Sequence, residues 1–195
     1  MSSLGIAASV LACSFLIASC GTTSDSTKAV EYFDEQTGAT VSVVDTPLVF
    51  AYSRPELAAN LRDYISLVAV AVNRSGTVQY WLVAYFWSTV DRRDDGTPAL
   101  QPSSLVVAAD DRRINLPLTT TSAHEAGFDQ QVHAPSGFKG VPSVFRTDLH
   151  TLGFIAASRT LTVRLGVDDS APQYEIWEDA RPQLSNFVRS LGGSP

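Results

Sequence analysis

The sequence predicts an α+β fold: a mainly antiparallel β-sheet with two or three packed helices, including a C-terminal amphipathic helix. Three observations lead to this prediction. Short β-prone runs alternate with polar turns, two long apolar runs meet at a tight turn, and the last apolar residues follow helical spacing. The 195 residues provide for one globular domain, which we place at 30–192. A β-sandwich with small peripheral helices is the alternative.

The central element of this prediction is a hairpin over residues 64–91. Its two apolar runs are separated by Asn73-Arg74-Ser75-Gly76, a polar turn that ends in glycine. The second run is apolar at both alternating sets of positions, so we expect a central strand covered on both sides. Core packing is the expected role of its aromatic residues, and an exposed docking face around Trp81 and Trp87 is the alternative.

The remaining elements follow from local signals. Ser53, Pro55 and Glu56 have the spacing of a capping box and predict a short helix. A second helix is expected after Thr147 or Asp148, and a third from about Ala180, where leucine, phenylalanine and valine recur at helical spacing. Strands are expected at 30–33, 40–44, 48–52, 104–109, 114–118, 160–166 and 174–177.

Residues 119–146 have no clear periodicity and are rich in threonine, serine, glycine and proline. Long connections inside a compact domain are usually functional loops or elements that the pattern fails to reveal. The apolar residues among them, such as Phe128 and Phe138, are numerous enough to hold the segment on the body of the domain.

Composition excludes some classes of function. The formal net charge is −6, so the chain lacks the excess of basic residues that a nucleic-acid-binding protein uses to neutralise phosphates. Its only cysteines are Cys13 and Cys20, and therefore nothing after Cys20 can form a disulfide or a thiolate metal site. The fold has to be stabilised by its hydrophobic core.

The N-terminus carries the most specific motif of the chain. Residues 4–19 form an apolar run as long as the hydrophobic region of a signal peptide, and this run ends in Ile17-Ala18-Ser19-Cys20. This arrangement resembles the lipobox of the bacterial lipoproteins. The resemblance implies a signal peptide over 1–19 and acyl chains, palmitate among them, attached at Cys20. It also implies a lipid anchor in the membrane, followed by a flexible tether at 20–29.

The residue after the cysteine is Gly21 and not aspartate. In lipoproteins of Gram-negative bacteria an aspartate at this position commonly retains the protein at the inner membrane. For a Gram-negative source, the resemblance therefore implies a protein anchored in the outer membrane and facing the periplasm.

No pattern of catalytic or metal-binding residues stands out. His124, His133 and His150 lack the close spacing of metal ligands, and Asp94-Asp95-Gly96 fills too few positions of a calcium loop. Ser136 is not in the glycine-flanked turn that exposes a hydrolase nucleophile. We therefore expect no enzymatic activity, no cofactor and no metal.

Two charged turns are the candidate interaction surface. One contains Arg92 and Arg93 between Asp91 and Asp94-Asp95, and the other contains Arg112 and Arg113 after Asp110-Asp111. The simpler interpretation is solvated turns with local ion pairs. The functional interpretation is a surface that binds a carboxylate or phosphate of an envelope partner.

These observations favour a non-enzymatic, lipid-anchored envelope protein that acts through protein interaction. The alternative is a periplasmic lipoprotein that binds a small ligand, with residues 119–146 as a lid over the site. A hydrolase whose catalytic residues follow no recognisable motif is a weaker third hypothesis.

Overall fold

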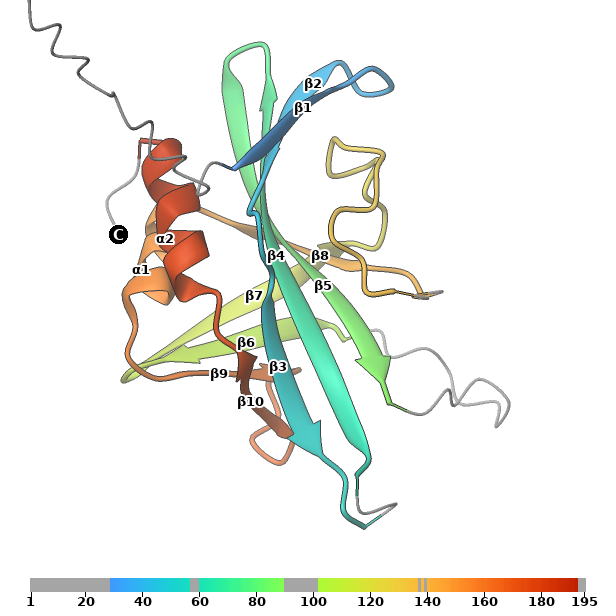
Figure 1. The fold of residues 1–195 in the computed structure, drawn as a ribbon, viewed down its shortest axis with the longest axis vertical. Coiled ribbons are helices and arrows are strands. Elements are labelled where there is room, and N and C mark those ends of the chain that lie inside the picture. The colour runs from blue at the N-terminus through green and yellow to red at the C-terminus, as the bar shows by residue number, and fades with distance from the viewer. Residues whose placement is uncertain (1–28, 57–59, 90–101, 137, 139, 193–195) are drawn as a thin grey trace, which may run out of the picture.

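The chain folds into a closed antiparallel β-barrel with two short helices on one side (Figure 1). This computed structural model describes residues 29–56, 60–89, 102–136, 138 and 140–192. The strands are β1 (Val30–Asp34), β2 (Ala39–Val43), β3 (Leu48–Ser53), β4 (Arg62–Arg74), β5 (Thr77–Ser88), β6 (Ser104–Ala109), β7 (Arg112–Thr120), β8 (Ser143–Thr147), β9 (Leu161–Leu165) and β10 (Gln173–Glu178). The helices are α1 (Leu149–Ala157) and α2 (Arg181–Ser190).

Eight strands close the barrel in the order β4-β3-β10-β9-β6-β7-β8-β5, and β5 pairs back onto β4. All of these pairings are antiparallel. The hairpin of β1 and β2 adds to the C-terminal half of β4, where Val43 pairs with Val70 and Thr40 pairs with Asn73. The prediction of an α+β fold was therefore wrong, and so was the alternative of a sandwich.

The error has an identifiable cause in β8. All but the last residue of this strand lie in the span 119–146, where the sequence shows no period, and the strand pairs with β7 on one side and β5 on the other. Without β8 the remaining strands form an open sheet whose free face would need helices to cover it. With β8 the sheet closes, and much of the apolar surface is buried inside the barrel.

The β4–β5 hairpin agrees with the prediction. Its turn consists of Ser75 and Gly76, whose φ angles are 52° and 87°. Positive φ at both central residues is the geometry that matches the twist of two-residue hairpins, and glycine adopts it without steric cost. The central parts of both strands are buried, as expected for strands covered on two sides.

The register of the strands defines the inside of the barrel. Paired residues on neighbouring strands point to the same side of a sheet. Phe50 pairs with Ile65, Leu82 pairs with Phe145, and Val107 pairs with Val163. All six are at most 2% exposed, so this side of the sheet forms the core.

The opposite side of β4 and β5 is covered by the segment 121–142. Tyr85 contacts Phe138 edge to face with ring centroids 5.0 Å apart. Gly127 lies so close to β4 that a Cβ atom there would be 3.1 Å from a methyl group of Val72. The other side of the hairpin faces the interior of the barrel, so both of its faces are buried. The helices lie on the side of the hairpin opposite the segment 121–142 (Figure 1).

Two of the three predicted helices form. Asp148 caps α1 by accepting a hydrogen bond from the backbone N–H of Thr151 at 2.7 Å, and α2 begins one residue after Ala180. The helix expected after Ser53 is not formed by the residues described there. Ser53 ends β3, the side chain of Glu56 pairs with Arg54 instead of capping a helix, and residues 57–59 lie outside the description.

Candidate interaction surface

The two arginine turns predicted as an interaction surface do not form one surface in the part of the chain described. Arg112 and Arg113 are consecutive in β7 and therefore point to opposite sides of the sheet. Arg112 lies over the ring of Phe154 in α1, 4.7 Å from its centroid, whereas Arg113 binds the carboxylate of Asp169 at 2.8 Å. Arg92, Arg93 and Cys20 lie outside the described residues.

Arg113 lines a small surface depression whose charges are already paired. Its other charged residues are Arg164, Asp168 and Asp169, and its cavity volume is about 50 Å³. The guanidinium of Arg164 donates to the Oε1 atom of Gln173 at 2.8 Å and also approaches Asp169. With two arginines and two aspartates in contact or nearby, the depression has no excess charge with which to bind an ion.

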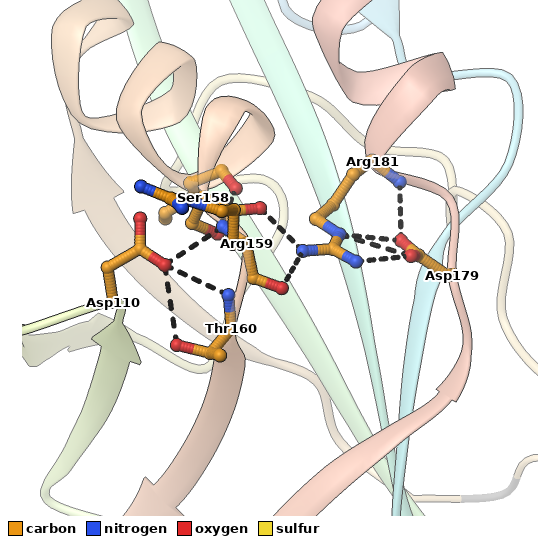
Figure 2. Close-up of polar contacts among 7 residues, drawn as sticks. Asp110, Ser158, Arg159, Thr160, Asp179 and Arg181 are labelled. Carbon is orange, nitrogen blue, oxygen red and sulfur yellow. Dashed lines mark hydrogen bonds and ion pairs between the residues drawn. The ribbon is translucent and has the colours of Figure 1, made fainter.

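A second polar cluster joins three connections of the fold (Figure 2). In the β6–β7 turn, the Oδ1 atom of Asp110 accepts hydrogen bonds from the backbone N–H groups of Arg159 and Thr160, each at 2.9 Å. These bonds, the one from Thr160 first, hold the pKa of Asp110 below its ordinary value. Arg181, at the start of α2, donates to the carbonyls of Ser158 and Arg159.

Arg181 also pairs with Asp179, and that hydrogen bond raises the pKa of the guanidinium and lowers the pKa of the carboxyl. The cluster thus fixes the α1–β9 connection to the β6–β7 turn and to α2. Because these hydrogen bonds occupy Asp110 and Arg181 within the fold, we assign the cluster a structural role.

The histidines do not form a metal site in the described part of the chain. His124 is 3.5 Å from Asp129, measured from Nδ1 to Oδ1, and both side chains are more than half exposed. No group of three or more histidine, cysteine, aspartate or glutamate residues is arranged to hold a metal among the described residues.

Residues 119–146 were predicted as a lid; their ends belong to β7 and β8, and the described residues of the segment 121–142 between them are packed onto the hairpin. Phe128 is 1% exposed and Val132 is 6% exposed. Tyr85 beneath it is also 1% exposed, and burial raises its pKa to about 12 although a hydrogen bond with the backbone of Val132 opposes the shift. The two depressions described on the molecule are lined by other residues. This packing disfavours a ligand cavity under the segment.

Aromatic and arginine side chains gather instead on the outside of the barrel, where they come from β4, β5 and β10. We call Arg62, Tyr64, Trp87 and Trp177 the aromatic–arginine surface. Tyr64 pairs directly with Trp87 across the hairpin, and their rings stack with centroids 4.1 Å apart and an interplanar angle of 11°. The indole N–H of Trp87 donates to the hydroxyl of Ser66 at 3.0 Å, which fixes the orientation of that ring.

Trp177 reaches this pair from β10, across β3. Tyr64 is paired with Ala51, whose small side chain leaves room above β3, and the rings of Tyr64 and Trp177 meet edge to face at 6.1 Å. Arg62 and Tyr64 are two residues apart in β4 and share its outer face. The guanidinium of Arg62 lies 4.5 Å from the centroid of the Trp177 ring.

The residue types of this surface are common in protein-binding sites. Trp177 remains 50% exposed although it is a large aromatic residue, while Tyr64 beside it is buried. Tryptophan, tyrosine and arginine are the residues that most often dominate the binding energy of protein interfaces. A rigid cluster of them also loses little side-chain entropy when a partner binds, because neighbouring contacts already hold the rings.

Sequence reasoning did not identify this surface. It weighed an exposed role for Trp81 and Trp87 together, whereas Trp81 is 4% exposed and only Trp87 reaches the aromatic–arginine surface. A signal did exist in β10. Tyr174 and Ile176 alternate with Glu175 and Trp177, so an alternating strand places Trp177 on the polar face beside Glu175.

Comparisons with known proteins do not assign the chain to a family: no family model, no curated protein and no solved structure matches it. Among the described residues, neither helix has the length and apolar character needed to cross a membrane.

Proposed function

We propose that this protein is a non-enzymatic, lipid-anchored envelope protein that acts by binding another protein through the aromatic–arginine surface. The observation that carries the proposal is the half-exposed Trp177, held against Tyr64 and Arg62 on a rigid barrel wall. The lipobox motif that ends in Cys20 supports the anchoring part of the proposal. Gly21 supports sorting to the outer membrane, with the body of the protein in the periplasm.

The position of the surface along β4 suits this role. Arg62 is the first residue of β4, whereas the β1–β2 hairpin, which follows the proposed tether, pairs with Val70 to Asn73 near the other end. At about 3.3 Å per residue, Arg62 is about 26 Å along β4 from Val70, the residue level with Val30 at the start of β1. A partner that binds at Arg62 would therefore contact the opposite end of β4 from the β1–β2 hairpin (Figure 1).

Site-specific photo-cross-linking tests whether a protein binds at the aromatic–arginine surface. The photoreactive amino acid p-benzoylphenylalanine replaces Trp177 in the full chain. This variant is produced in cells that make the protein naturally. We expect a discrete cross-linked protein after irradiation. The matched control carries the same amino acid at Val167, which is 70% exposed on the β9–β10 turn. The absence of a cross-link at position 177, or the same products from both positions, would contradict the proposal.

Substitution of the lipidated residue tests the anchoring part. We expect Cys20→Ala to leave the signal peptide uncleaved and to abolish acylation, because the thiol that receives the lipid is missing. Labelling with a radioactive or alkyne-bearing fatty acid, together with detergent fractionation of membranes, measures both effects. Cys13→Ala is the control and should have no effect. Labelling that persists in Cys20→Ala would show that the anchor is elsewhere or absent.

A further inference from the structure

The guanidinium of Arg62 lacks an acidic partner among the described residues. Its backbone N–H and carbonyl bond to Thr89, and its side chain lies on the ring of Trp177. The neighbouring Asp63 binds Arg54 at 3.0 Å instead. Other arginines of the chain are paired with carboxylates, among them Arg54, Arg113, Arg164 and Arg181. Among the described contacts, the half-buried guanidinium of Arg62 is held by an aromatic ring and not by an acid.

The position of Arg62 over the Trp177 ring prepares this arginine to bind an anion. A guanidinium over an aromatic ring is attracted by the π-electrons, and the N–H groups in its own plane can still donate to other acceptors. The planar fork of N–H donors matches a carboxylate, which it can bind with two parallel hydrogen bonds. Because Trp177 already restricts the side chain, little conformational entropy remains to be lost on binding.

The exposed indole of Trp177 beside the guanidinium favours a ligand that also carries an apolar group. Half of the Trp177 side chain remains accessible, and an apolar partner group placed on it would gain the free energy of burying aromatic surface. Glu175 and Glu178 flank Trp177 in β10 and are exposed, so a ligand with several negative charges would be repelled. A single carboxylate next to an apolar side chain fits the charges and surface on this part of the barrel.

We propose that Arg62 and Trp177 recognise an aspartate or glutamate carboxylate next to an aromatic or aliphatic side chain in a polypeptide partner. This inference rests on the proposed function and specifies the chemistry of the partner. A polypeptide is preferred to an anionic lipid surface because the site is at the end of β4 remote from the β1–β2 hairpin and because acidic residues flank it. A lipid bilayer, in contrast, presents many negative charges at once.

A peptide library tests this chemistry. The probe is a phage-displayed library of random dodecapeptides, panned against the detergent-solubilised full chain. We expect enriched peptides to carry one acidic residue within two positions of an aromatic or aliphatic residue. Their binding should fall at least tenfold with Arg62→Gln and with Trp177→Ala. Arg62→Lys, which keeps the charge but loses the planar fork, should give an intermediate loss.

Arg112→Gln is the matched control. It also removes a guanidinium that lies over an aromatic ring, 4.7 Å from the centroid of Phe154, but at a different place on the barrel. Peptide binding should be unchanged in this variant. Circular dichroism and thermal unfolding of every variant establish that the fold is retained.

Three results would overturn the inference. The first is enrichment of peptides without acidic residues, or enrichment that survives Arg62→Gln. The second is that the unsubstituted protein enriches peptides no better than the Trp177→Ala variant does. The third is capture of phosphatidylglycerol vesicles that falls tenfold with Arg62→Gln, which would identify a lipid headgroup as the ligand.

The photo-cross-link separates failure of this inference from failure of the proposed function. A cross-link at position 177 that persists at equal yield with Arg62→Gln would show that a protein partner binds without the carboxylate contact. The proposed function would then stand and the inference would fall. Loss of the cross-link in Arg62→Gln, together with its retention in Arg112→Gln, is the result that we expect.

Discussion

Asp34 is a buried carboxylate that connects two segments far apart in the sequence. Its Oδ1 atom accepts hydrogen bonds from the backbone N–H groups of Gln36 and Thr37, and its Oδ2 atom accepts one from Asp129 at 2.7 Å. Burial by itself would raise the pKa of Asp34, but the hydrogen bonds from Asp129, Thr37 and Gln36 outweigh it and lower the pKa. The ionised side chain therefore fixes the β1–β2 turn to the segment 121–142.

We expect Asp34→Asn to lower the free energy of unfolding by about 2 kcal/mol at pH 7, since it weakens hydrogen bonds to a charged acceptor. A carboxyl with a lowered native pKa stabilises the fold above its unfolded-state pKa of about 3.9 and loses this contribution as the pH falls toward the native pKa. The difference between wild type and Asp34→Asn should thus be constant from pH 7 to about 5 and shrink below about pH 4.

Urea unfolding at a series of pH values measures this difference. Asp45→Asn is the control, because Asp45 is exposed and binds only the hydroxyl of its neighbour Thr46 among the contacts described. A difference between wild type and Asp34→Asn that stays constant down to pH 2 would show that the carboxylate is not ionised preferentially in the folded state.

At the scale of elements, β8 decides whether the sheet is open or closed. Val144 and Phe145 are completely buried, and Phe145 pairs with Leu82 of β5 and Leu118 of β7. The strand is short, and serine, arginine and threonine occupy its other positions, so the apolar alternation that marks a strand is too brief to be recognised. Its conformation depends on its two neighbours in the barrel.

We expect Phe145→Ala to lower the free energy of unfolding by about 3–5 kcal/mol, because it removes a fully buried aromatic side chain at the closure of the barrel. Val141→Ala, at a residue 50% exposed just before β8, should change it by less than about 0.5 kcal/mol. Guanidinium chloride unfolding, followed by far-UV circular dichroism, measures both. A loss of less than about 1 kcal/mol in Phe145→Ala would mean that β8 contributes little to closure.

At the scale of the whole molecule, the barrel gives the three tryptophans different solvent exposures. Trp81 is 4% exposed beside Arg146 of β8, Trp87 is half-buried in its stack with Tyr64, and Trp177 is 50% exposed. Only the assembled barrel creates this difference, because Trp81 and Trp87 lie on the same strand and the same face of it.

Acrylamide quenching of tryptophan fluorescence should report these differences in solvent exposure. We expect Trp177→Phe to reduce the quenching constant, since it removes the most accessible indole, and Trp81→Phe to increase it, since it removes a protected one. Both substitutions retain an aromatic ring and serve as controls for each other. Equal quenching constants in the two variants would contradict the exposures that underlie the aromatic–arginine surface.

The sequence by itself determined the elements whose signals are local. The turn at Ser75 and Gly76, the cap at Asp148 and the spacing of apolar residues in α2 depend on neighbours within a few residues, so they were predicted correctly. Only the tertiary structure decided the closure of the barrel and the position of the candidate site. β8 becomes a strand through pairing with β5 and β7, and Arg62 meets Trp177 across more than a hundred residues of chain. Contacts between residues so distant in the sequence leave no periodic trace in it, because each partner is set by strand order and register.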